Sequence, residues 1–329
     1  MIRRLTRWHA TLIAVFTCLT LVLTNCATQT TTSSTSPSPT ASPSAASTAA
    51  LVFGLGGQPA NLEPGNITDN NSIYLHYQIY DHLLNFKAGT TEPEPALATE
   101  WSSPDGKTWT FKLRDDVKFQ DGTPFNAEAV KFNVERWWDP AAPTGFRDAG
   151  RGYEIWPGLF GDFKGAEGSL LQAVNAKDAT TIEFVLAQPF AAFPIAIGSG
   201  YFGIASPDAI KKAGPSYGIP GSPAVGTGPY TLEEWRSDDR IVLKANPDYW
   251  GEKAKSEQVV VRFIKDPAAR LAELRAGTID FTVELAPDQL TEIKADPSLT
   301  SLFRESFNVG YFALNPSYEP LAKPEVRKA

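Results

Sequence analysis

Cysteine is scarce in this sequence. The 329 residues include two, Cys18 and Cys26. Cys18 lies inside the uncharged apolar run Ala10–Leu23, which is typical of a secretory signal peptide and is removed after export. Cys26 then has no partner in the chain, so an intrachain disulfide cannot stabilise the fold. A lone cysteine in an exported protein needs another explanation.

Histidine is also scarce, and the common metal-binding strings are missing. No H-E-x-x-H, C-x-x-C or EF-hand string occurs, and the acidic residues are scattered, with no pair that stands out as catalytic. His76 and His82 are six residues apart and would lie on different faces of a helix. This spacing favours packed or hydrogen-bonded side chains over metal ligands, and we expect no metal site.

The string G-x-S-x-G occurs once, at Gly214–Gly218. In the hydrolases that use this string, the serine lies on a strand-to-helix turn and the catalytic histidine follows it in the chain. Here a predicted helix precedes Ser216, and all three histidines, the last being His82, come earlier in the sequence. A serine hydrolase of that type is therefore excluded.

Clusters of basic residues are missing too. The formal net charge is −7, and an acidic surface repels phosphate backbones, so we expect no nucleic-acid partner. The segment Gly54–Pro59, GLGGQP, follows an apolar stretch, but Pro59 stands where a dinucleotide site needs Gly or Ala, and no helix signal follows. We expect a glycine-rich turn that permits close backbone approach, and no cofactor.

The N-terminus carries an export signal. Arg3, Arg4 and Arg7 precede the apolar run, which is too short for a comfortable membrane span. The run ends in LTNC, Leu23–Cys26, which resembles the lipobox of bacterial lipoproteins, although Asn25 stands where that motif usually has a small residue. The resemblance implies a signal peptide at 1–25 and a lipidated Cys26; an ordinary secretory signal cleaved nearby is the alternative. Removal of residues 1–25 would leave a net charge of −10.

Residues 27–50 are almost entirely Thr, Ser, Pro and Ala. Such a segment cannot bury enough surface to fold. With Cys26 it predicts a tether at 26–50 between a lipid anchor and a globular body. A mucin-like stalk is the alternative.

From Leu51 the sequence alternates strand and helix signals, and its apolar content of 42% suits a globular core. The predicted strands lie at 50–55, 180–186, 229–235, 240–245, 257–264, 278–285 and 307–315, with a hairpin at 100–119. The predicted helices lie at 71–84, 125–138, 206–214, 266–277 and 286–296. Asn126, Ser206 and Asp266 are their expected N-caps. Interleaved strands and helices indicate an α/β fold.

Four segments together resemble a known family. They are Leu97–Arg136, Pro223–Gly251, Arg270–Phe281 and Gly310–Ala329. In this order and spacing they are similar to the extracytoplasmic solute-binding proteins of family 5, the peptide-, oligopeptide- and nickel-binding components of ABC importers. The resemblance implies a periplasmic-binding-protein-like (type II) fold of two lobes around a cleft. It also implies that the chain binds a solute and is not an enzyme.

The resemblance implies a domain division as well. Residues 51–68 and 198–314 would form the first lobe, residues 69–197 a subdomain inserted in it, and residues 315–329 the hinge and the start of the second lobe. Leu321–Ala329 carries a helix start signal at Pro324. In the family this segment begins the first helix of the second lobe, so we expect the chain to correspond to the front part of a longer, truncated protein, with most of that lobe missing.

The expected ligand site is therefore one wall of a cleft. By position, the resemblance implies backbone contact with a ligand at Gly56, Gly57 and Gln58, and weaker contributions from Asp238, Asn308 and Tyr311. The implied partners are a peptide or related small solute, a membrane reached through Cys26, and a permease with its ATPase; the chain itself would be a monomer. An exported enzyme, or an adhesion or binding domain of unknown ligand, is the alternative function.

Overall fold

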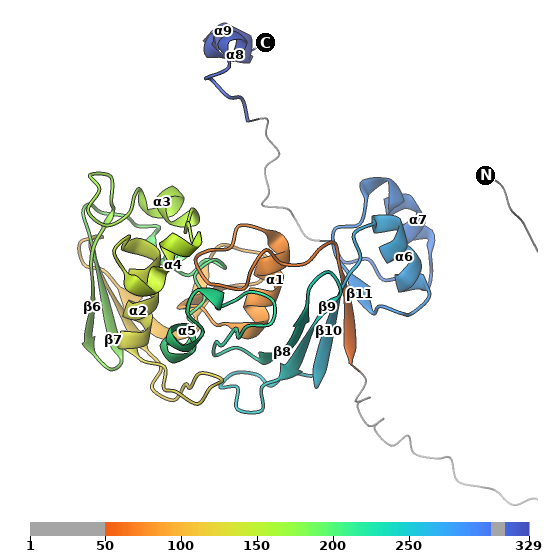
Figure 1. Ribbon diagram of the computed structural model, residues 1–329, viewed down its shortest axis with the longest axis horizontal. Helices are drawn as coiled ribbons and strands as arrows, with labels where there is room; N and C mark the ends of the chain where they lie inside the picture. Colours follow the sequence, from red (N-terminus) through yellow and green to blue (C-terminus); the bar gives the residue numbers. More distant parts are fainter. Residues whose placement is uncertain (1–49, 304–312, 329) are drawn as a thin grey trace, which may run out of the picture. The chain divides into compact units, whose positions relative to one another are not determined.

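The computed structural model describes residues 50–303 and 313–328 (Figure 1). Cys26, Asn308, Tyr311 and most of the strand predicted at 307–315 lie outside the described residues. None of the helices among the described residues has the length and apolar character needed to cross a membrane.

The first of two large sheets has five strands. Their order is β11 (Phe281–Thr282), β1 (Leu51–Leu55), β10 (Gln258–Phe263), β9 (Arg240–Ala245) and β8 (Tyr230–Arg236). β1 runs parallel to β10 and β11, whereas β9 is antiparallel to both β10 and β8. The carboxyl ends of β1, β10 and β11 therefore meet at one edge, together with the turn between β8 and β9.

Helix α1 (Asn70–Ile79) packs against this sheet. Its N-cap is Asp69, whose carboxylate accepts a hydrogen bond from the Ser72 amide at 2.9 Å. The buried core of the five-stranded sheet includes Leu75 and Tyr80, although the sequence places residues 69–197 in the inserted subdomain. Residues 70–80 thus contribute to the same core as β1.

The buried face of α1 differs from the prediction. In the sequence, Ile73, Tyr77, Tyr80 and Leu84 recur at helical spacing, which predicts that they share one face, but the helix buries Ser72, Leu75, His76 and Ile79. Tyr77 is 42% exposed, and Tyr80 and Leu84 are buried but lie beyond the end of the helix. Tertiary packing selects the buried face here, because this segment is apolar or aromatic on several sides.

The second large sheet is antiparallel, in the order β4 (Ala98–Ser102), β5 (Thr108–Leu113), β7 (Thr181–Leu186) and β6 (Leu171–Asp178). Helix α2 (Ala127–Trp138) packs on β6 and β7 (Figure 1). The Asn126 side chain accepts a hydrogen bond from the Ala129 amide at 3.0 Å, so the predicted N-cap is confirmed. The predicted hairpin is confirmed. The helical spacing of Val130, Val134, Trp137 and Trp138 predicts a buried stripe, and all four side chains are buried.

The remaining elements are short. They are β2 (Leu84–Phe86), β3 (Pro93–Pro95), η1 (Pro143–Gly145), η2 (Arg147–Ala149), α3 (Ile155–Phe160), α4 (Phe193–Ile197), α5 (Pro207–Ala213), η3 (Gly214–Ser216), α6 (Pro267–Arg275), η4 (Pro287–Gln289), α7 (Leu290–Ala295), α8 (Glu319–Ala322) and α9 (Pro324–Lys328). Ser206 and Asp266 cap α5 and α6 as predicted.

Two further predicted elements are shorter than expected, besides α1, which ends at Ile79. The strand predicted at 278–285 pairs with β1 over two residues, and the helix predicted at 286–296 begins as the 3-10 turn η4. Glu284 ends the pairing, because its backbone is left-handed, with φ 56°. Such a conformation is uncommon for a non-glycine residue and breaks a strand.

A buried ion cluster links the segment before α1 to the second core. Arg136 on α2 donates to Oε1 of Glu63, and Arg151 Nε lies 2.5 Å from Oε2. The Tyr153 hydroxyl donates to the same Oε1 at 2.9 Å. The side chains of Glu63 and Arg136 are fully buried.

Candidate functional site

The carboxyl edge of the five-stranded sheet collects the sequence-predicted site residues that the structure describes. The loop Gly56–Gln58 follows β1, and Asp238 lies on the turn between β8 and β9. Open α/β sheets bind ligands outside the carboxyl ends of their parallel strands, because the connecting loops and their free backbone groups gather there. This edge is therefore the candidate functional site.

Gln58 and Asp238 meet at this edge, although 180 positions separate them. The side-chain Oε1 of Gln58 accepts a hydrogen bond from the Asp238 amide at 3.0 Å. Asp238 has a left-handed backbone, with φ 57°, and its carboxylate lies 3.8 Å from Lys265 Nζ in an exposed ion pair. The sequence predicts both residues as ligand contacts, and the structure places them side by side.

The glycines of the loop run close to two side chains that the sequence analysis missed. A Cβ atom on Gly56 would lie 3.3 Å from Arg270 Nη1, and one on Gly57 would lie 3.3 Å from Asn71 Nδ2. The loop is therefore closely packed between α6 and the beginning of α1. This confirms the close backbone approach predicted for GLGGQP.

Arg270 holds the strand ends at this edge. It is 3% exposed, and Nη1 donates to the carbonyls of Ile264 (2.7 Å) and Lys265 (3.1 Å), which follow β10. Its Nη2 donates to the carbonyl of Glu284 at 2.8 Å. Among the described residues, no carboxylate pairs with this buried guanidinium. The sequence feature that could have indicated a buried Arg270 is its position next to Leu271 in a helix with a predicted N-cap.

Glu284 is a third residue at this edge that the sequence did not indicate. It follows β11, and its side chain reaches α1. Its Oε1 accepts one hydrogen bond from Asn70 Nδ2 at 3.2 Å and another from the Tyr74 hydroxyl at 3.1 Å. The residue is exposed. No local sequence signal pointed to Glu284, because its role depends on a left-handed backbone and on contacts more than 200 positions away.

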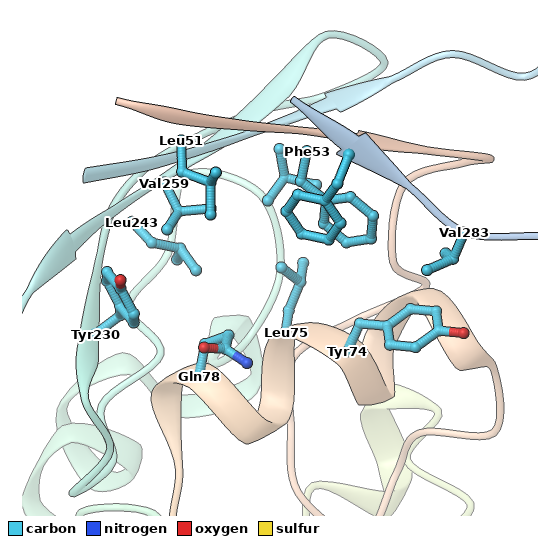
Figure 2. A pocket seen from close by; sticks show the side chains of 11 residues that line it. Leu51, Phe53, Tyr74, Leu75, Gln78, Tyr230, Leu243, Val259 and Val283 are labelled. Carbon is cyan, nitrogen blue, oxygen red and sulfur yellow. The ribbon is translucent and has the colours of Figure 1, made fainter. Parts of the chain in front are cut away.

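An apolar cavity of about 210 Å³ lies between the sheet and α1 (Figure 2). Figure 2 shows Tyr74, Leu75 and Gln78 of α1 facing strand residues such as Phe53 and Val259. Phe281 also lines it and stacks on Phe53, with ring centroids 4.3 Å apart.

The two described histidines pack against tyrosine rings. His76 and His82 are buried, and burial lowers the pKa of His76 to about 3 and that of His82 to about 4, so both are neutral at pH 7. Within residues 50–303 and 313–328, no group of three or more His, Cys, Asp or Glu is arranged to hold a metal ion.

Several bacterial binding proteins are similar to this chain in sequence. The chain is 34% identical over 287 residues to the probable D,D-dipeptide-binding periplasmic protein DdpA of Escherichia coli (strain K12), covering 85% of this chain and 52% of that protein. It is 33% identical to the dipeptide-binding protein of the same strain over 85% of this chain and 53% of that protein. The chain spans about half the length of the curated relatives it matches.

Solved structures show the same fold. The periplasmic binding protein DppA from Helicobacter pylori, in complex with the peptide STSA, matches with a TM-score of 0.67 and 33% identity, over 76% of this chain and 49% of that chain. HbpA2 from Haemophilus parasuis matches with a TM-score of 0.71 and 28% identity, over 83% and 55%. The α/β prediction is thus confirmed over about half the length of these proteins.

The family model described as bacterial extracellular solute-binding proteins, family 5, middle part, matches residues 92–329. This match covers the second sheet and most of the first. The family consists of solute-binding proteins that are not enzymes. The chain therefore belongs to the bacterial extracellular solute-binding proteins of family 5.

Proposed function

We propose that this chain contributes to the solute-binding component of an ABC importer and that its ligands are short peptides. The observation that carries the proposal is the convergence of Gly56–Gln58 and Asp238 at the carboxyl edge of the sheet. A loop without bulky side chains lets a peptide backbone approach and exchange hydrogen bonds with it. The relatives named above as dipeptide-binding proteins support this ligand class.

The proposal includes the domain division. Residues 51–68 and 198–314 form the first lobe, residues 69–197 the inserted subdomain, and residues 315–329 the hinge region and the start of a second lobe that closes over the ligand. Two separate sheets support the division. Because α1 shares the core of the five-stranded sheet, residues 70–80 are better grouped with the first lobe.

Peptide binding by this chain is expected to be weak. A pocket that buries 70–90% of its ligand needs two walls, and the candidate site in residues 50–303 and 313–328 is one edge of one sheet. We expect the purified chain to bind tripeptides with a Kd well above the micromolar range, with amide shifts at Gly56–Gln58 in an NMR titration. Calorimetry that gave a submicromolar Kd would contradict the one-walled site, and unshifted loop amides at millimolar peptide would contradict the proposed function.

The proposal also covers export and anchoring, through lipidation of Cys26. A chain expressed in its bacterial host is expected to fractionate with the membrane, whereas Cys26→Ser is expected to be released into the soluble fraction, since acylation is the anchor. Cys18→Ser is the matched control and should leave the fractionation unchanged. Metabolic labelling with a fatty acid reports the modification, and equal membrane fractions for both variants would exclude the anchor. The lipidated chain would deliver its ligand to a permease and, through it, to the ATPase.

A further inference from the structure

We propose that Arg270 is a positioning residue of the ligand site: it fixes the loop Gly56–Gln58 in the conformation that binds a peptide, without touching the peptide itself. This inference rests on the proposed function and names the residue that shapes its site. Arg270 lies on α6 and is 3% exposed, and its guanidinium reaches the carbonyls that follow β10 and β11 from the buried side.

Two consecutive hydrogen bonds connect Arg270 to the loop. Its Nη1 donates to the carbonyl of Ile264 at 2.7 Å, and the amide of Ile264 donates to the carbonyl of Leu55 at 2.8 Å. Leu55 is the last residue of β1 and directly precedes Gly56. The guanidinium therefore holds the residue whose amide fixes the point at which the loop leaves the sheet.

Gly56 also lies directly against the guanidinium. A Cβ atom at this position would lie 3.3 Å from Nη1 and 3.6 Å from Cζ of Arg270, and the first of these distances is shorter than an ordinary van der Waals contact. Because glycine has no side chain, the loop backbone can pack on the guanidinium. At Gly57 the neighbouring group is instead Asn71 Nδ2 on α1, at 3.3 Å, so the two glycines have different neighbours.

The same guanidinium fixes the strand ends on both sides of the loop. Nη2 donates to the carbonyl of Glu284 at 2.8 Å, and Nη1 donates to that of Lys265 at 3.1 Å. These carbonyls follow β11 and β10, the two strands that pair with β1. One side chain thus sets the spacing of the three strand ends from which the site is built.

The residue type matters as much as its position. No carboxylate pairs with Arg270 in the described part of the chain, and its buried Nε has no hydrogen-bond partner there. A buried cation without a counter-charge is costly. A planar guanidinium can donate to several carbonyls at once in a fixed geometry, which an apolar residue or a lysine cannot do. Arg270 therefore contributes the geometry of this edge.

A double-mutant cycle tests the contact between Arg270 and Gly56. The probe is Ala-Ala-Ala, titrated into the purified chain and followed by NMR. Gly56→Ala should weaken binding about threefold to tenfold, because the added methyl group pushes the loop away from the guanidinium. Arg270→Ala should weaken binding about tenfold, and Gly56→Ala in that background should change the Kd by less than about twofold, because the group that it meets is gone.

Three further variants are controls. Gly57→Ala meets Asn71 rather than Arg270, so it should change the Kd by the same factor in both backgrounds. Arg270→Lys keeps the charge but cannot reach all the carbonyls, and should weaken binding by an intermediate factor. Leu271→Ala removes the adjacent buried side chain of α6, and should lower the free energy of unfolding but leave the Kd unchanged.

Amide hydrogen exchange reports on the loop without a ligand. The Ile264 amide, which donates to Leu55, should exchange about tenfold faster in Arg270→Lys than in the unmodified chain, because its carbonyl is no longer held. The amides paired between β9 and β10 should exchange at unchanged rates. This milder variant covers the case of an Arg270→Ala chain that fails to fold.

The outcomes separate this inference from the proposed function. Independent, additive effects of Arg270→Ala and Gly56→Ala would overturn the inference, and so would an equal loss of affinity in Leu271→Ala, which would leave Arg270 as a structural residue of α6. An unchanged Kd in every Arg270 variant would overturn it as well. If millimolar Ala-Ala-Ala did not bind to the unmodified chain, the proposed function would fall, and the binding role of Arg270 with it.

Discussion

Glu63→Gln is expected to lower the free energy of unfolding by about 3–5 kcal/mol, the largest loss we expect from a single substitution. The substitution keeps the shape of the side chain and removes its charge. Arg136, which is fully buried, and Arg151, which is 12% exposed, would then have no carboxylate to balance them. Removal of one charged partner from a buried ion cluster destabilises the fold by more than the intact cluster stabilises it. The reason is that the remaining charges stay out of water without a counter-charge.

Urea unfolding followed by tryptophan fluorescence measures this loss. The matched control is Glu252→Gln, whose ion pair with Lys255 is more than four-fifths exposed on both sides and should change stability by less than about 1 kcal/mol. A loss no larger for Glu63→Gln than for Glu252→Gln would show that the buried cluster does not hold the segment before α1 to α2.

Acidification is expected to destabilise the fold by about 4 kcal/mol between pH 7 and pH 5. Burial lowers the pKa of His76 to about 3, with a smaller contribution from the charge of His82, and lowers that of His82 to about 4. The unfolded chain takes up protons near pH 6.5 while the folded chain stays neutral. Stability is therefore fully present above pH 6.5 and is lost as the pH falls, at about 1.4 kcal/mol per unit for each histidine.

The variants His76→Phe and His82→Phe test the assignment. Each keeps an aromatic ring and removes one titrating group, so the slope of unfolding free energy against pH should fall by half, and the double variant should be nearly flat between pH 7 and pH 5.5. Asp81 contributes with the opposite sign, because burial raises its pKa above the ordinary carboxyl value and protonation of the folded chain then favours folding as the pH falls. A slope that stays the same in both single variants would refute the assignment.

Elements with strong local signals agree with the sequence-based predictions. The hairpin around Pro104-Asp105-Gly106, the caps Asn126, Ser206 and Asp266, and the buried stripe of α2 all follow from side chains a few residues apart. Their conformations are stabilised by short-range hydrogen bonds and regular apolar spacing, which any fold containing them would preserve.

The elements that were predicted poorly depend on distant contacts. The buried face of α1 is selected by the sheet it packs on, and β11 ends after two residues because Glu284 takes a left-handed backbone held by Arg270. Neither the preceding nor the following residues carry that information. A sequence pattern shows which side chains are apolar, but it does not show which distant elements those side chains will pack against.

The candidate site shows the same division. The glycine-rich string predicts a close turn at Gly56–Gln58 after a strand, and the family resemblance implies that Asp238 lies near a ligand. The tertiary structure adds three features that the sequence does not show: Gln58 accepts a hydrogen bond from the Asp238 amide, the buried cation Arg270 holds the strand ends, and the Glu284 side chain reaches α1 beside an apolar cavity. The physical reason is that parallel strands far apart in the chain bring their carboxyl ends together only once the sheet has formed.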